Sequence, residues 1–354
     1  MPSSRVSHEI QSIAHPAEDF PADRTVVWSP IFQAAWDRMN QELGGPPYKV
    51  EPPNVLMAGL DAFAWDANRD LPAGGWKVWS GQPTPEFLEL ANREAAQMTG
   101  EEEGPFTLPP LPPDIPLLAV LALLNRNPAF EAEFHPDPIS LRFHTAAGES
   151  QTVRCFGTGN TSLSYYSKPV RILHYGADSK ALSIAVRKDG GEADSGESVV
   201  LYQPPQRESF QAAWTKVQLW FREGLCGERG SEADPRLHSG DQLCIPYLDL
   251  EADSNLGPRL GGARYHQGFE NPWEILGAWM RTKFKMNEKG VELRVIVELL
   301  GGSWSRPVPN VPRDLRFNRP FFVFLCRDGA EWPYFGAWIG DHAALMESFD
   351  PEEK

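Results

Sequence analysis

The amino-acid sequence predicts an α+β fold, with helices gathered toward the N-terminal half and strands toward the C-terminal half. Two observations carry this prediction. Apolar residues repeat every three or four positions in the stretches 29–43, 85–97 and 207–222, a spacing typical of amphipathic helices. From residue 117 onward, most apolar stretches are short and are separated by Gly, Asp, Asn and Ser, which indicates strands and turns.

Three stretches have helical spacing. The first opens at Ser29-Pro30, because proline is tolerated in a first helical turn, and it ends at the Gly-Gly-Pro-Pro run 44–47. The third carries large apolar residues at intervals of four, three and four positions: Phe210, Trp214, Val217 and Phe221. The polar, Pro-containing residues 1–23 are typical of a loose lead-in.

The continuous apolar run 117–125 predicts a strand that is buried on both faces. A Pro-rich stretch at 104–116 has the composition of a linker, but it runs directly into this strand. Further strand-like segments follow in this order: ISLRFHT, TVRCF, VRILHY, ALSIAVR, SVVLYQ, QLCIPYL, FFVFLC and YFGAWIG. Because there is no internal repeat, we expect residues 1–354 to form a single domain.

The chain carries a formal net charge of -15 at pH 7. Binding to nucleic acid, to an anionic membrane surface or to a heparin-like polyanion needs clustered Lys and Arg, so the charge argues against all three. We expect a soluble monomer whose partners are proteins.

No motif proposes catalysis or metal binding. The 8 histidines are scattered, and Cys and His never cluster. The partial glycine motif GTGNTS at 157–162 falls between strands rather than at a strand-to-helix turn, which favours an ordinary turn over a phosphate site. We therefore expect no enzyme activity, no metal and no cofactor.

The cysteines are Cys155, Cys226, Cys244 and Cys326, and their spacing requires no disulfide. Cys244 and Cys326 lie in apolar segments, where cysteine usually acts as a small buried hydrophobe. The N-terminus lacks the apolar stretch of a signal peptide, so a cytoplasmic location is the default expectation. Secretion stays open in case a signal has been removed.

The run VELRVIVELL at 291–300 alternates large aliphatic residues with charged ones. Five such aliphatic residues left in water would each forgo about 1.5–3 kcal/mol of burial. The alternation therefore predicts a strand with one buried and one charged face. A loose hydrophobic loop is the competing interpretation.

Several segments resemble the serpin superfamily of protease inhibitors. They are, in chain order: VVWSPIFQAAW, LALLNRNPAFEAEFHPDPISLRFHTAAGESQTVRCF, HYGADSKALSIAV, DQLCIPYLDLEADSNL, FKMNEKGVE and LRFNRPFFVFLCRDGAEWPYFGAWIGD. The resemblance covers about 117–340, with Phe130 where a tryptophan is usual. It implies N-terminal helices packed on a large mixed or antiparallel sheet, followed by further C-terminal strands. Between the first two helices the chain is shorter than the family, so some early helices must be missing.

The resemblance places the hinge of a mobile reactive loop at Glu288 and Gly290. An inhibitory serpin has small residues after this hinge, because that segment is first exposed and then inserted into the main sheet when a protease cuts the loop. Here Val291 and Leu293 are bulky. We therefore expect 291–300 to be inserted from the start, so that the protein inhibits weakly or not at all and acts by protein binding. The alternative is a covalent suicide inhibitor of a serine or cysteine endopeptidase.

A second departure agrees with a sheet that is already sealed. The family usually has a hydrogen-bonded cluster of Ser, Asn and His beneath the central strands. At the corresponding places this chain has Phe32, Ala122 and Met280, which are all apolar. We expect them to seal the sheet by packing rather than by polar contacts.

The remaining loop, 301–314, is expected to be exposed. Counting from the hinge places the scissile bond near Trp304-Ser305, whereas counting back from Phe317 places it near Pro309. Trp304 suits a chymotrypsin-like pocket, and Arg306 a trypsin-like one, although Pro307 disfavours cleavage there. Trp and Arg are also typical of binding epitopes. A plain connecting loop is the third interpretation.

Overall fold

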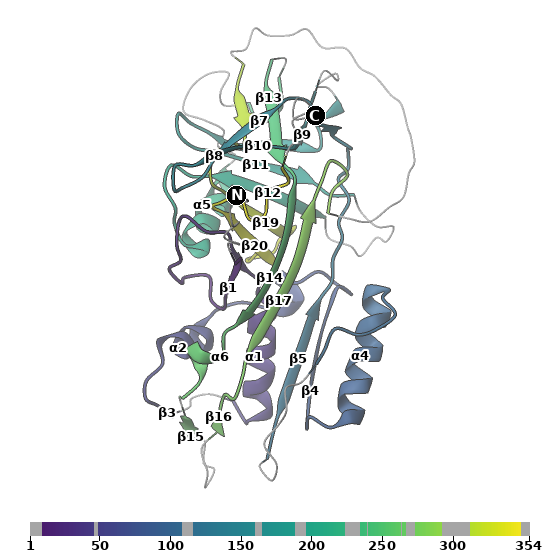
Figure 1. Ribbon diagram of the computed structural model, residues 1–354, viewed down its shortest axis with the longest axis vertical. Helices are drawn as coiled ribbons and strands as arrows, with labels where there is room; N and C mark the ends of the chain where they lie inside the picture. The colour runs from purple at the N-terminus through teal and green to yellow at the C-terminus, as the bar shows by residue number, and fades with distance from the viewer. Residues whose placement is uncertain are drawn as a thin grey trace, which may run out of the picture.

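A computed structural model describes residues 9–45, 49–107, 116–159, 165–187, 196–223, 234–238, 240–262, 264–266, 273–291 and 312–347. The helices in this part of the chain are α1 (Ile31–Glu42), α2 (Val55–Ala62), α3 (Ala67–Asp70), α4 (Pro85–Thr99), α5 (Phe210–Glu223) and α6 (Gly257–Leu260). Together with one large mixed sheet, they confirm the predicted α+β class (Figure 1). The three predicted helices correspond to α1, α4 and α5.

A seven-stranded sheet crosses the upper half of the molecule, below the other strands there (Figure 1). Its strands, in spatial order, are β1 (Gln11–Ile13), β2 (Val26–Trp28), β20 (Phe335–Ile339), β19 (Phe321–Arg327), β12 (Glu197–Gln203), β11 (Lys180–Ala185) and β10 (Val170–Tyr175). β1 pairs with β2 in parallel, and the other pairs are antiparallel. β1 lies within the expected lead-in 1–23, and Phe20 is buried, so part of that segment belongs to the core.

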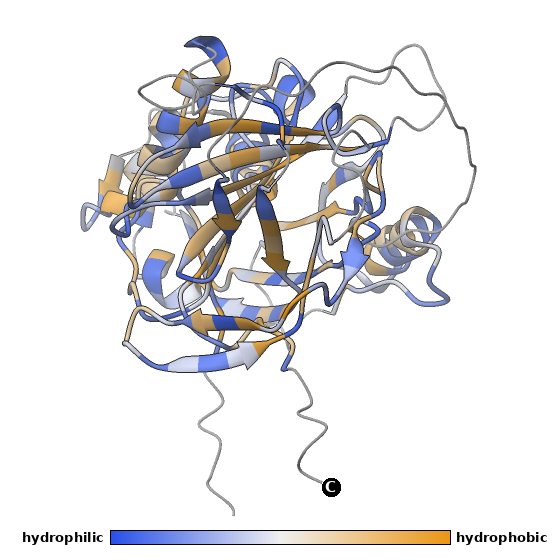
Figure 2. Cartoon of the chain, turned by 90° about the horizontal axis from the view of Figure 1, so that it is seen from above, coloured by the Kyte–Doolittle hydropathy of each residue, from blue (hydrophilic) through white to orange (hydrophobic). Residues whose placement is uncertain are grey.

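Two apolar clusters cover the two faces of this sheet, because successive side chains of a strand point to opposite faces. In β12, Val199 and Leu201 face one cluster, whereas Val200 and Tyr202 face the other together with Trp214 of α5. Many strands in Figure 2 accordingly carry orange segments interrupted by blue or white ones.

A four-stranded sheet lies above it, in the order β18 (Asp314–Arg316), β13 (Gln242–Pro246), β9 (Cys155–Gly157) and β6 (His135–Pro136). A disulfide joins Cys155 on β9 to Cys244 on β13. Cys244 is buried, as expected, but it is one half of a disulfide, a state that the sequence left open. The spacing of 89 residues gave no hint of the bond, because only strand pairing brings the two positions together.

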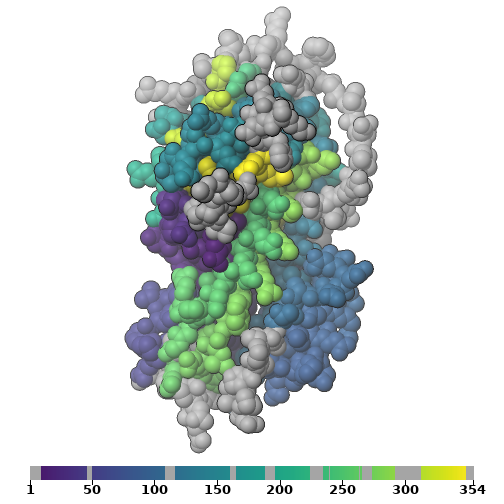
Figure 3. Space-filling model, in the orientation of Figure 1, coloured from purple at the N-terminus to yellow at the C-terminus, as the bar shows by residue number. Residues whose placement is uncertain are grey.

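Two long hairpin-like pairs form the lower half. β14 (Leu248–Asn255) pairs with β17 (Trp279–Met286), and β4 (Trp76–Gly81) pairs with β5 (Ala119–Leu124). In the space-filling view, a green strip containing β14 and β17 runs beside the blue residues of the β4, β5 and α4 region (Figure 3). Smaller elements complete the fold: β3 (Lys49–Glu51), β7 (Leu141–His144), β8 (Ser150–Val153), β15 (Arg264–His266) and β16 (Trp273–Glu274).

The strand predicted at 117–125 exists as β5, but every residue in it is only half-buried. The expectation of burial on both faces was wrong for the described structure. β5 pairs with β4 along one edge, and within the described residues it has no strand partner along the other.

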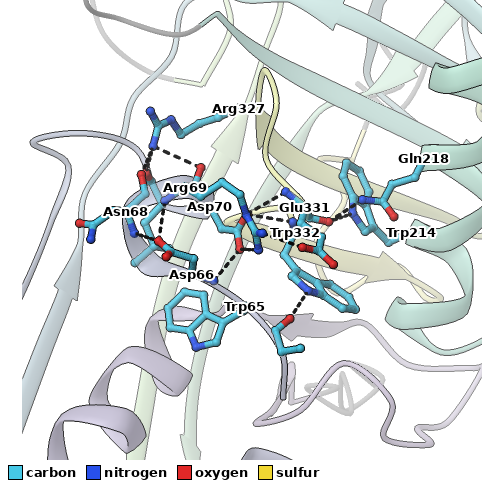
Figure 4. Close-up of polar contacts among 12 residues, drawn as sticks. Trp65, Asp66, Asn68, Arg69, Asp70, Trp214, Gln218, Arg327, Glu331 and Trp332 are labelled. Carbon is cyan, nitrogen blue, oxygen red and sulfur yellow. Dashed lines mark hydrogen bonds and ion pairs between the residues drawn. The ribbon is translucent and has the colours of Figure 1, made fainter. Parts of the chain in front are cut away.

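The buried carboxylate of Asp70, at the end of α3, ties the lower half to the turn between β19 and β20 (Figure 4). It accepts hydrogen bonds from the backbone N–H groups of Glu331 and Trp332, at 2.8 and 3.2 Å, and pairs with Arg69 at 2.7 Å. Arg327 donates to the carbonyl oxygens at the end of the same helix, which have no partner within the helix. The short α3 thus serves as a joint between the halves.

Candidate functional site at the two ends of the loop

The segment predicted to be a hinge is a tight turn at the end of β17. Asn287 and Gly290 exchange backbone hydrogen bonds at 3.0 and 3.2 Å, and the side chain of Asn287 accepts one from the N–H of Lys289 at 2.9 Å. Gly290 has φ +132°, a conformation that favours glycine. A Cβ atom there would approach the carbonyl oxygen of Pro128 to 2.6 Å. The turn therefore requires glycine, both for its backbone angle and for space.

The turn docks onto the segment that follows β5. Val291 donates its N–H to Pro128 at 2.8 Å, and Phe130 donates to Lys289 at 2.9 Å. Gly290 forms antiparallel bridges with two residues, Asn287 at the end of β17 and Ala129 beyond β5. The chain has thus reversed at Gly290 and lies between the upper ends of the two strand pairs, with Val291 buried.

Glu288 points toward β13 and β14, where the hydroxyl of Tyr247 donates a hydrogen bond to its carboxylate at 2.8 Å. Burial, followed by the contact with Glu288, raises the pKa of the Tyr247 hydroxyl, which therefore remains a donor at neutral pH. The guanidinium of Arg154 lies 4.6 Å from the centre of the Tyr247 ring and pairs with Asp137 at 2.7 Å.

A cavity of about 300 Å³ opens beside this cluster and is bordered by Arg154, Tyr247 and Glu288. Its other charged walls, Lys285 and Asp249, pair with each other at 3.0 Å. The charges lining the cavity are thus balanced within the protein, which gives it no preference for a cation or an anion.

The other end of the loop returns at Pro312, which packs against Gly240. Next to it, the guanidinium of Arg313 forms an ion pair with Asp241 at 2.7 Å, in which both side chains are almost completely buried. The backbone N–H of Arg313 also donates to the Asp241 carboxylate, at 2.8 Å. A buried ion pair is stable only when its remaining N–H donors find acceptors. The guanidinium of Arg313 meets this need by donating a further hydrogen bond to the carbonyl oxygen of Asp234.

Beyond Arg313 the chain forms β18, which pairs in parallel with β13. The buried ammonium group of Lys180 donates to the carbonyl oxygens of Asp314 and Arg316 at 3.0 and 2.7 Å. Burial lowers the pKa of Lys180 to about 8. The returning chain is therefore held by an ion pair, a strand ladder and a lysine.

The sequence predicted eight site residues, of which the structure describes Glu288, Gly290 and Val291. The others lie outside the described residues: Leu293, Trp304, Ser305, Arg306 and Pro307. Phe32 and Met280 pack in one apolar cluster, and Ala122 lies on β5.

Sequence reasoning missed Tyr247, Arg313 and the Asp241 that pairs with Arg313. In the sequence, these three residues are marked only by their position next to apolar strand-like segments. Among the described residues, no helix is long and apolar enough to cross a membrane, and no group of His, Cys, Asp and Glu is arranged to hold a metal.

No protein-family model matches the sequence, and no curated protein matches it. Solved structures do match. Human thyroxine-binding globulin, in a complex with its hormone, is 12% identical and has a TM-score of 0.51, with 92% of this chain and 93% of that chain covered. Human glycosylated kallistatin is 12% identical with a TM-score of 0.50, and 91% of this chain and 92% of that chain are covered. Both of these proteins are serpins. At these identities the likeness concerns the fold, and the chain described here has the serpin fold.

Proposed function

We propose that this protein belongs functionally with serpins that inhibit proteases weakly or not at all. In this proposal, residues 291–300 form an additional strand between β17 and β5 in the intact molecule, and the protein acts by binding another protein through the loop 301–314. The observation that carries the proposal is the pair of antiparallel bridges from Gly290 to Asn287 and to Ala129. A chain that continued in this direction would enter between the two strand pairs.

The edges of β5 and β17 support such a strand. β17 pairs with β14 on one side and β5 pairs with β4, and neither has a further strand partner among the described residues. Bare edges expose unpaired N–H and C=O groups, and β5 adds half-buried apolar side chains. An inserted strand would pair with these backbone groups and cover these apolar side chains. It would also leave no mobile segment that could insert into the sheet after cleavage.

The first test compares two substitutions on opposite faces of the proposed strand. Val295→Asp would place a carboxylate on the buried face and should lower the free energy of unfolding by about 3 kcal/mol or more. The matched control Arg294→Asp lies on the charged face and should change it by less than about 0.5 kcal/mol. Equal, small effects in urea unfolding would show that 291–300 is not a buried strand.

The second test concerns inhibition. The intact protein is digested briefly with chymotrypsin or trypsin, and its melting temperature and SDS gel pattern are measured before and after. We expect cleavage within 301–314 with little change in melting temperature, and no SDS-resistant complex. A rise of tens of degrees, or a covalent complex with either protease, would instead establish the suicide inhibitor.

The binding role is tested with Trp304→Ala and Arg306→Ala. For a partner identified by crosslinking to the intact protein, we expect both variants to retain the melting temperature and to bind at least about tenfold more weakly. Unchanged affinity in both would exclude the loop as the binding epitope. Size-exclusion chromatography of the free protein tests the predicted monomer.

A further inference from the structure

We propose that a cavity beside the turn between β10 and β11 binds a small oxyanion, such as a carboxylate, phosphate or sulfate group. The cavity has a volume of about 370 Å³ and is bordered by that turn, by Asp314 of β18 and by the segment leading into β19. Two cationic side chains line it, Lys180 and Arg319. The cavity lies apart from the one at the hinge and shares no lining residue with it.

Lys180 is the central group. Its side chain is 8% exposed, and its ammonium group donates to two backbone carbonyl oxygens, those of Asp314 and Arg316. An ammonium group has three N–H donors. Within the described residues, no carboxylate lies within ion-pair distance of it and no acceptor takes its third donor. A buried cation without a counter-charge is costly, so Lys180 attracts an anion.

Arg319 adds a second donor at the rim. Its guanidinium donates to the carbonyl oxygen of Asp178 at 3.1 Å, and it forms no ion pair within the described part of the chain. Burial lowers the pKa of Lys180, the charge of Asp314 acts to raise it, and the positive charges of Arg319 and Arg316 act to lower it. Two positive side chains and one negative side chain therefore act on Lys180.

The neighbouring acidic groups form no ion pair with Lys180 within the described residues. The carboxylate of Asp314 acts on Lys180 through its charge but pairs with Arg316, at 2.7 and 2.8 Å. Asp178 is exposed and screened by water, and His144, which also lines the cavity, is exposed. The phenol oxygen of Tyr175 accepts the N–H of Asp314 at 3.0 Å and leaves its own O–H able to donate.

An oxyanion in the cavity would accept charge-assisted hydrogen bonds from Lys180 and Arg319. It would keep Lys180 protonated and so strengthen the two bonds that this side chain makes to β18. The site is therefore linked to the end of the loop at which the chain returns to the sheet, and occupancy should stabilise that attachment.

The test uses the full chain with inorganic phosphate and, separately, succinate, each against sodium chloride at matched ionic strength. Isothermal titration calorimetry at pH 7 should show saturable binding, and the melting temperature should rise with occupancy. Binding of phosphate alone would identify a phosphate or sulfate group, and binding of succinate alone a carboxylate. Heats and melting shifts that follow ionic strength alone would overturn the proposal.

Variants keep the test specific. Arg319→Gln removes an exposed side chain, so the fold is retained, and affinity should fall at least about tenfold through loss of one charge-assisted bond. Lys180→Met should abolish binding. Arg281→Gln, on the exposed face of β17, is the matched control and should bind as the parent does. Equal affinity in the parent and in Arg319→Gln would contradict the assignment, whatever happens to the stability of Lys180→Met.

Discussion

Asp241 and Arg313 illustrate how much one buried pair can matter. Replacing Asp241 by Asn would leave the guanidinium of Arg313 buried without its counter-charge, since both side chains are almost inaccessible to water. We expect the free energy of unfolding to fall by about 3–5 kcal/mol, measured by urea denaturation. The control Asp253→Asn breaks an exposed pair with Arg281 and should cost less than about 1 kcal/mol. Similar losses in both variants would contradict a special role for the buried pair.

Lys180 makes stability depend on pH. Its pKa is about 8 in the folded protein and 10.5 is the ordinary value, so between these values the unfolded chain binds more protons. Stability contributed by this group therefore rises as pH increases from about 8 to 10.5, and it is lowest below pH 8. The free energy of unfolding of the parent and of Lys180→Met is measured in urea at pH 7 and 10. From pH 7 to pH 10 it should increase more in the parent than in the variant. A constant difference would mean that the pKa is not lowered.

At the scale of elements, the hinge turn depends on one glycine. In Gly290→Ala the new Cβ would meet the carbonyl oxygen of Pro128 at 2.6 Å, at φ +132°. We expect a loss of about 1–3 kcal/mol and faster hydrogen exchange at Val291 and Phe130, whose N–H groups bond across the turn. Gly148→Ala is the control: φ is also positive there, but nothing lies within 4 Å of the added Cβ. Gly148→Ala should lower the free energy of unfolding by less than Gly290→Ala does, and it should leave hydrogen exchange at Val291 and Phe130 unchanged.

The disulfide stabilises the sheet to which the returning chain is attached. β13 carries Cys244 and pairs with both β9 and β18. Removing the bond in a Cys155→Ser and Cys244→Ser double variant should cost about 2–4 kcal/mol in urea unfolding. A reductant should destabilise the parent and leave the double variant unchanged. Structural disulfides are rare in a reducing cytoplasm. The cytoplasmic location and secretion both remain predictions, and thiol titration of the native protein tests whether the bond is formed.

At the scale of the whole molecule, Asp70 couples the two halves. Its carboxylate accepts bonds from Glu331 and Trp332 in the turn between β19 and β20, and its helix α3 follows directly on α2, which lies in the lower half (Figure 1). In Asp70→Ala these buried donors lose their acceptor, so we expect a loss of about 3 kcal/mol or more. Hydrogen exchange should rise selectively in α2 and α3. Protection that falls uniformly across the chain would instead show that the halves unfold as one unit regardless of this contact.

Much of the fold could be predicted from the sequence, because its signals are local. Helical spacing located α1, α4 and α5, and alternation and turn residues located most strands of the large sheet. The resemblance singled out Gly290 as a hinge position, which remains a prediction, and the structure shows why glycine is needed there in the close approach to Pro128. The short α2, α3 and α6 were missed, since helices of four to eight residues carry too little periodicity to recognise.

What the sequence determined by itself was therefore the class of fold, the main elements and the unusual bulk of residues 291–300. What only the tertiary structure decided were contacts between positions far apart in the chain. They include the Cys155–Cys244 disulfide, the Asp241–Arg313 pair and the burial of Lys180 beneath β18. The physical reason is that the burial, the ion pairing and the pKa of a side chain depend on the residues around it. Those residues are brought together by the pairing of strands that lie tens of residues apart in the chain.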